Sequence, residues 1–186
     1  MSNCDISNGI SLGCRDNSGG IEAIYILSGS TPTITEASEG LISDLDGTGV
    51  WYKFELTKNV GDFTETPTVS LENGTVYYEQ VVNVAFHKLQ SSLRNTVKVL
   101  AQNPDLKIIV QTNNGVETPY TGKFFYVGNR RGATLSGGTG ATGTAFGDAS
   151  QYALSFLGQE VEPAEEIDVT STGALTDALT GYTVGS

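Results

Sequence analysis

The sequence predicts a mainly β protein with a β-sandwich or barrel-like core, one long hairpin and one flanking α-helix. Three observations support this fold class. The 186 residues include 23 glycines and many Thr and Ser, and such a composition is typical of turns and of pleated strands. Short β-branched and aromatic runs recur along the chain. Helical periodicity is clear in one segment alone. A chain of this length buries about 70% of its unfolded surface, which is enough for a self-sufficient core.

The predicted strands are short apolar or aromatic runs that end at Gly, Asn, Asp or Pro. In chain order, we expect strands over Ile21–Leu27, Thr31–Thr35, Val50–Leu56, Phe63–Leu71, Thr75–His87, Leu106–Thr112, Gly122–Val127 and the alternating Tyr152, Leu154 and Phe156.

A long hairpin is the clearest local prediction. The runs 63–71 and 75–87 are joined around Asn73-Gly74, a dipeptide that tolerates the positive φ angles of a tight hairpin turn. In the second run, Val82, Val84 and Phe86 share one parity and Asn83 has the other. This period of two indicates that one face of the hairpin is buried.

One amphipathic helix is predicted over 88–102. Its apolar residues recur at helical spacing, and Asn103-Pro104 ends it because the residue before a proline disfavours helical backbone. The apolar positions are Leu89, Leu93, Val97 and Leu100.

The chain divides into an irregular N-terminal arm (1–19), a single β-rich domain (20–168) and a Thr/Gly-rich C-terminal tail (169–186). Asn113-Asn114-Gly115 is expected to be a turn. Residues 128–147, which have almost no large apolar side chain, are expected to be a long surface loop. The acidic run from Glu160 to Asp168 is expected to be solvated, because clustered like charges repel when buried.

Charge and composition exclude several functions. The chain has 21 acidic and 10 basic residues, a net charge of -11, which argues against a protein that coats nucleic acid. No apolar run approaches the ~20 residues of a membrane helix, and no export signal is expected.

Cys4 and Cys14 are too few for a disulfide framework or a Cys-rich zinc site. We expect reduced thiols, with an N-terminal disulfide as the alternative.

Catalytic and cofactor motifs lack the context that they need. Gly9-Ile10-Ser11-Leu12-Gly13 has nucleophile-elbow spacing without the flanking strand and helix, and His87 is the only histidine. The Gly138–Gly143 run has dinucleotide-fingerprint spacing, but no strand ends at its first glycine. We therefore expect neither an enzyme nor a bound cofactor.

A calcium loop is a weaker alternative at Asp44, Asp46, Thr48 and Glu55, which approximate the ligand spacing of a twelve-residue calcium loop. A calcium loop of this type leads into a helix, whereas Trp51 begins a β-like run. A plain Asp-Gly turn is therefore the favoured interpretation.

Several residues are candidate contacts between subunits, because hairpin tips and loops become ordered by such contacts. Asn73-Gly74-Thr75 is formally a glycosylation acceptor and is better explained as the hairpin turn. Arg130-Arg131 is expected to be solvated or to pair with an acidic neighbouring subunit. The candidate set is Asn73, Gly74, Arg130, Arg131, Gly138 and Gly140.

The whole chain resembles the tail tube (major tail) proteins of bacteriophages. The resemblance lies in the opening strand 20–26 after a polar arm, the hairpin through Asn73-Gly74, the single helix, and the Gly-rich segment leading to 149–160 and 163–166. It implies a virion protein that forms hexameric rings, which stack into a tube. Its partners would be itself and other tail proteins, and genomic DNA would pass without specific binding. The Thr-rich segment after Asp168 departs from a simple tube subunit.

Two alternatives stay open. One is another virion component, such as a neck, head-decoration or adhesin-like domain. The other is a calcium- or carbohydrate-binding β-sandwich. In the tube interpretation, the acidity belongs to a surface that lets DNA pass.

Overall fold

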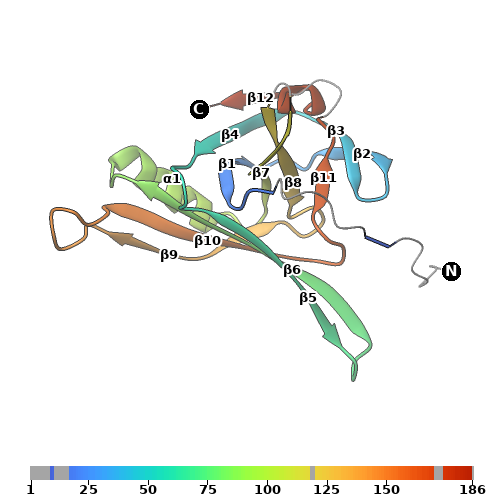
Figure 1. Ribbon diagram of the computed structural model, residues 1–186, viewed down its shortest axis with the longest axis horizontal. Coiled ribbons are helices and arrows are strands. Elements are labelled where there is room, and N and C mark those ends of the chain that lie inside the picture. The colour runs from blue at the N-terminus through green and yellow to red at the C-terminus, as the bar shows by residue number, and fades with distance from the viewer. Residues whose placement is uncertain (1–8, 11–16, 118–119, 170–173, 186) are drawn as a thin grey trace.

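The computed structural model describes residues 9–10, 17–117, 120–169 and 174–185. It is mainly β, as predicted, with one α-helix and one short 3-10 helix (Figure 1). The elements are β1 (Ile21–Ser28), β2 (Thr33–Ser38), β3 (Leu41–Asp46), β4 (Gly49–Glu55), β5 (Asp62–Ser70), β6 (Thr75–His87), α1 (Ser91–Gln102), β7 (Leu106–Glu117), β8 (Tyr120–Val127), β9 (Ala133–Ala141), β10 (Gln151–Glu160), β11 (Glu165–Ile167), η1 (Leu175–Ala178) and β12 (Tyr182–Gly185).

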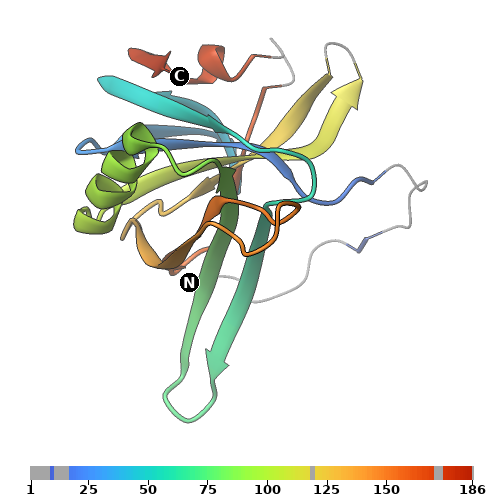
Figure 2. The same cartoon turned by 90° about the vertical axis from the view of Figure 1, so that its left-hand side faces the viewer.

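The strands form one 12-stranded sheet with two parts. A curled part has the order β12-β4-β1-β7-β8-β11-β3-β2, and a long part has the order β9-β10-β6-β5. The two parts meet where Leu106 of β7 pairs with Ala133 of β9. Figure 2 shows the β5–β6 hairpin extending well beyond the body formed by the other strands.

Strands β1 and β7 are buried on both faces and separate two apolar clusters. Ile24 and Ile26 of β1 pack into the first cluster, between the two parts of the sheet. Tyr25 and Leu27 pack into the second cluster, inside the curled part. The nearly continuous apolar run of β1 is typical of a strand with both faces covered.

Helix α1 covers one end of the first cluster. Leu93, Val97 and Leu100 pack against that cluster, as the helical spacing predicts. The helix begins at Ser91, because Lys88 has a φ of 70° and Gln90 is extended. It ends before Asn103, whose extended backbone fits the residue preceding a proline.

Two loop predictions were wrong. Asn113-Asn114-Gly115 lies within β7, and the irregularity appears as a register shift against β8 between Gln111 and Gly115. Side-chain and backbone bonds from Asn113 to Gly19 and Gly20 hold this stretch extended. Nine of the 20 residues in the predicted 128–147 loop, Ala133–Ala141, form strand β9, which pairs with β10 along its length. Backbone pairing forms this strand with Leu135 as its only large apolar side chain.

The C-terminal segment belongs to the core instead of forming a separate tail. Val169, Leu175, Ala178 and Leu179 are buried in the second cluster. Strand β12 pairs in parallel with β4, and the Tyr182 ring packs against Trp51 with centroids 6.0 Å apart. The core therefore extends beyond the domain boundary that we predicted at residue 168.

The acidic run is only partly solvated, which corrects a further prediction. Glu160 is 3% exposed and Glu165 is 8% exposed. Glu160 ends β10 and Glu165 begins β11, so strand pairing draws both side chains into the body. Strand β3 was not predicted, because Ser43, Asp44 and Asp46 hide its short apolar pattern.

Candidate assembly surfaces

The long part of the sheet has one buried face and one open face. Val82, Val84 and Phe86 of β6 and Leu154 and Phe156 of β10, all even-numbered, lie in the first cluster. The odd-numbered residues point the other way and are partly or fully exposed. We call this second surface the open face. It carries mostly small or polar side chains, which include Asp62, Thr64, Thr66, Glu79, Val81, Asn83, Ala85, Ala153, Ser155, Leu157 and Gln159.

The open face has no positive side chain from its own strands. None of β5, β6, β9 and β10 contains Lys or Arg. A shallow hollow of about 400 Å³ lies on it near Asn83, Ala85 and Ser155. This surface therefore combines low relief with a neutral to negative charge.

Two edges of the long part lack a strand partner within the described residues. Strand β5 pairs with β6 alone. Strand β9 pairs with β10, and it meets β7 only at Ala133. Free edges expose backbone donors and acceptors that a second strand can use. Pro67 in β5 lacks a backbone N–H and so limits pairing on that edge.

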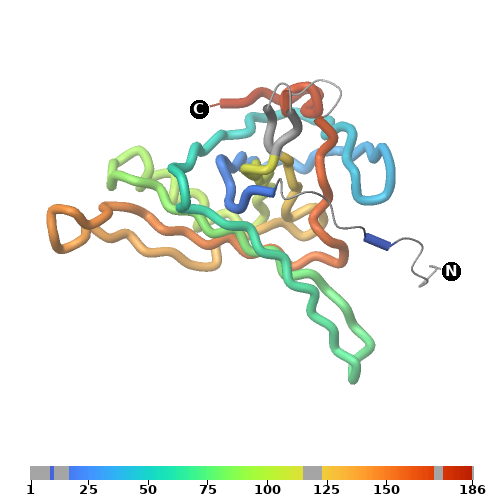
Figure 3. Tube along the Cα trace, viewed as in Figure 1, coloured from blue at the N-terminus to red at the C-terminus, as the bar shows by residue number. Residues whose placement is uncertain are grey.

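The hairpin tip is apolar and exposed. Val69, Leu71 and Val76 are 61%, 94% and 48% exposed. The turn contains Asn73 and Gly74, and Gly74 has a φ of 63°, as the hairpin prediction requires. The Cα trace in Figure 3 shows the tip far from α1. Grouped apolar side chains at a projecting tip are typical of a contact surface.

An apolar groove lies between α1 and the strands β1 and β4. Its volume is about 610 Å³, and Ile26, Tyr52, Phe54, Val99 and Leu100 contribute its apolar lining. Tyr52 is 53% exposed and Val99 is 57% exposed. This groove and the hairpin tip both expose apolar side chains.

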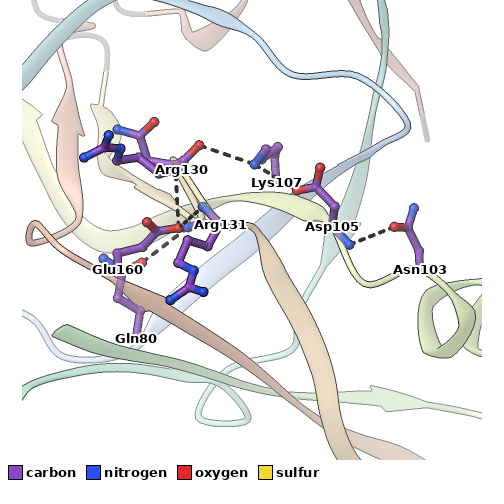
Figure 4. Close-up of polar contacts among 9 residues, drawn as sticks. Gln80, Asn103, Asp105, Lys107, Arg130, Arg131 and Glu160 are labelled. Carbon is purple, nitrogen blue, oxygen red and sulfur yellow. Dashed lines mark hydrogen bonds and ion pairs between the residues drawn. The ribbon is translucent and has the colours of Figure 1, made fainter. Parts of the chain in front are cut away.

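Arg130 and Arg131 are held through their backbone. Glu160 Oε1 accepts hydrogen bonds from the Arg130 and Arg131 amides at 3.1 and 2.8 Å (Figure 4). Both residues are exposed. No ion pair of either guanidinium occurs in the described part of the chain.

Buried polar residues surround this turn. The Lys107 ammonium lies 2.9 Å from Asp105 and donates to the Asn129 carbonyl at 3.3 Å (Figure 4). Gln80 of β6 accepts from the Gly128 amide at 3.3 Å. Side chains from several strands thus fix the β8–β9 connection, a role that the sequence pattern did not reveal.

The remaining candidate residues serve the fold. Gly138 and Gly140 lie within β9, opposite Leu154 and Tyr152, and not in a phosphate-binding loop. His87 Nε2 lies 2.8 Å from the Thr57 hydroxyl. The nucleophile-elbow serine, Cys4 and Cys14 lie outside the described residues.

The candidate calcium ligands are distributed over β3, β4 and the turn between these strands, which contains Thr48. Asp44 and Asp46 lie on β3, and Asp44 accepts a hydrogen bond from the Thr180 amide at 3.2 Å. Glu55 lies at the far end of β4 and pairs with Lys53 at 2.9 Å. Across the described ranges, no group of three or more His, Cys, Asp or Glu side chains is placed to hold a metal ion.

Comparisons with known proteins gave no match to a family model, to a curated protein or to a solved structure. Among the described helices, none has the length and apolar character needed to span a bilayer.

Proposed function

We propose that the protein is a virion structural protein, a phage tail tube subunit that self-assembles into stacked rings and so forms a conduit for DNA. The observation that carries this proposal is the open face, whose strands contain no Lys or Arg and which is flanked by two strand edges without a strand partner in the described residues.

The chemistry of the open face suits a channel wall. Proteins bind DNA mainly by neutralising phosphates with Lys and Arg. The open face offers Asp62 and Glu79 instead, together with small polar side chains such as Ser155. Negative charge repels phosphate, so DNA would move past this surface without adhering.

The free edges support ring closure. The β5 edge of one copy facing the β9 edge of the next makes a heterologous contact, and such contacts close into a ring when the rotation allows it. If every copy repeats this contact, all the open faces lie on the same side of the ring, which in this proposal is the side that lines the channel. We expect six copies in each ring, by the resemblance to tail tube proteins.

The hairpin tip supports stacking. The β5–β6 hairpin projects beyond the body, and Leu71 and its apolar neighbours at the tip are exposed, so they would contact the next ring. The α1 groove, which has a volume of about 610 Å³, offers a second apolar surface. Burial of such surfaces stabilises association by about 25 cal/mol per Å² of apolar area, before the costs of ordering.

Negative-stain electron microscopy with light scattering tests assembly. We expect rings or tubes with a central channel. Leu71→Ser should leave the monomer folded and shift tubes toward single rings, whereas Leu71→Met should keep the tubes. Finding only monomers over a range of salt and protein concentrations would contradict the proposal.

A lysine variant tests the channel wall. Thr66 and Gln159 are both exposed on the open face, so Thr66→Lys/Gln159→Lys should still assemble but retain DNA in a salt-dependent manner. Thr176→Lys/Thr183→Lys adds the same charge at exposed positions away from this face and is the control. Equal DNA retention by both variants would argue against a DNA-facing surface.

A further inference from the structure

An acidic pocket lies between the β2–β3 turn and the segment that leads into β11. Its volume is about 370 Å³, and its charged lining consists of Glu36, Glu39, Glu162 and Glu165, with no basic residue. We call it the glutamate pocket. It is separate from the open face, the hairpin tip and the α1 groove.

Glu165 distinguishes this pocket from an ordinary acidic surface. It is 8% exposed, and its Oε2 has no hydrogen-bond partner among the described residues. Burial raises the pKa of Glu165, and the Glu36 and Glu162 carboxylates raise it further. A buried carboxylate without a partner is costly, so a cation in this pocket would compensate a charge that the described part of one chain leaves unpaired.

The cation that fits is a guanidinium. The four glutamates do not form a group placed to hold a metal ion. A guanidinium supplies its own directed donors and binds carboxylates through two parallel N–H bonds. It does not require three carboxylates to converge on one point.

The chain itself supplies an adjacent pair of such groups. Arg130 and Arg131 are exposed, and neither side chain makes an ion pair in the described part. Glu160 fixes their backbone, so little backbone freedom is lost when their side chains bind. By contrast, Lys53, Lys107 and Lys123 are already paired with acidic neighbours.

We propose that the glutamate pocket of one copy receives the Arg130-Arg131 side chains of a neighbouring copy. The inference rests on the proposed self-assembly, and it adds a polar contact with a defined donor and acceptor. Removing one partner of a buried charge pair weakens binding strongly, because the other charge is left unpaired.

A charge exchange tests the contact. Arg130→Glu/Arg131→Glu and Glu36→Arg/Glu162→Arg should each raise the protein concentration needed for assembly by about tenfold or more. The two variants have complementary surfaces, so an equimolar mixture should assemble again, as should the chain that carries all four changes. All four residues lie outside the buried core, and melting curves of the monomers check that each variant is folded.

Lys58→Glu/Lys98→Glu changes the net charge by the same amount at other exposed positions and should assemble like the wild type. Glu165→Gln gives a second signature: it should weaken assembly while it stabilises the monomer. A role in folding alone would not give these opposite signs.

The outcomes separate the two proposals. Assembly of the wild type and of Arg130→Glu/Arg131→Glu at the same concentration overturns this inference and leaves the tube proposal standing. Assembly that EDTA abolishes and Ca²⁺ restores identifies a metal as the occupant and also overturns it. Failure of the wild type to assemble under all conditions overturns both.

Discussion

Gly138 of β9 lies directly opposite Leu154 of β10, and a Cβ on Gly138 would lie 2.7 Å from Leu154 Cδ2 and 3.0 Å from the Ala153 carbonyl oxygen. Leu154 is 4% exposed and belongs to the first cluster. The glycine therefore provides the space over which a core side chain lies. This packing role explains a Gly-rich strand without any phosphate ligand.

Gly138→Ala should lower the free energy of unfolding by about 1–2 kcal/mol, because the added methyl group overpacks this site. Gly137→Ala is the control, since a Cβ there meets nothing within 4 Å. Urea denaturation of the two variants measures the difference. Equal stabilities would show that the strand relaxes around the methyl group.

Glu160 should stabilise the β8–β9 turn through its two backbone bonds. Glu160→Ala leaves the Arg130 and Arg131 amides without this acceptor. It should lower the free energy of unfolding by about 2–3 kcal/mol. Glu160→Gln keeps an acceptor oxygen and should cost less. Chemical denaturation compares both with Gln159→Ala, a change at the exposed neighbour. If the Ala and Gln variants were equally unstable, the negative charge would be the important property.

Glu165 should make the monomer less stable as the pH rises. Its pKa in the folded state is raised above the ordinary value near 4.5, so the folded state binds the proton more tightly than the unfolded state. Stability then falls as the pH rises from about 4.5 through the folded-state pKa. Glu165→Gln should remove this fall and be more stable at pH 7. Melting curves of the wild type and Glu165→Gln are compared between pH 4 and 8, at concentrations too low for assembly. The stabilities of the two proteins should converge as the pH falls toward 4. A constant difference across that range would exclude this linkage.

The C-terminal segment should contribute to global stability. Leu179 is 2% exposed in the second cluster, and Leu179→Ala should cost about 2–4 kcal/mol through lost burial and a cavity. Thr176→Ala, at an exposed neighbour, should cost little. Trp51 is the only tryptophan and lies against Tyr182, so its fluorescence reports the transition. A Leu179→Ala variant as stable as the wild type would mean that the segment is only loosely attached.

The sequence predicted the elements whose patterns are local. The apolar run of β1, the parity of Val82, Val84 and Phe86 in β6, and the spacing in α1 each depend on nearby residues. Strand β9 was not predicted, because it depends on its partner β10. Backbone pairing with β10 holds β9 extended, and the Leu154 side chain packs over Gly138.

The candidate surfaces were harder to predict. The Asn73-Gly74 tip and the Arg130-Arg131 pair could be named from sequence. The burial of Glu165 depends on β11 pairing with β8 and β3, which are distant in the chain. No local pattern of charges indicates which glutamate of an acidic run enters a pocket.

Strands β1 and β7 are shared by both apolar clusters. Neither cluster can therefore lose its packing without removing one wall of the other. The body should unfold in one cooperative transition, and the amides of Ile24 and Ile109 should exchange with solvent only through global unfolding. The hairpin tip lies outside both clusters, so its amides should exchange freely while the body stays folded.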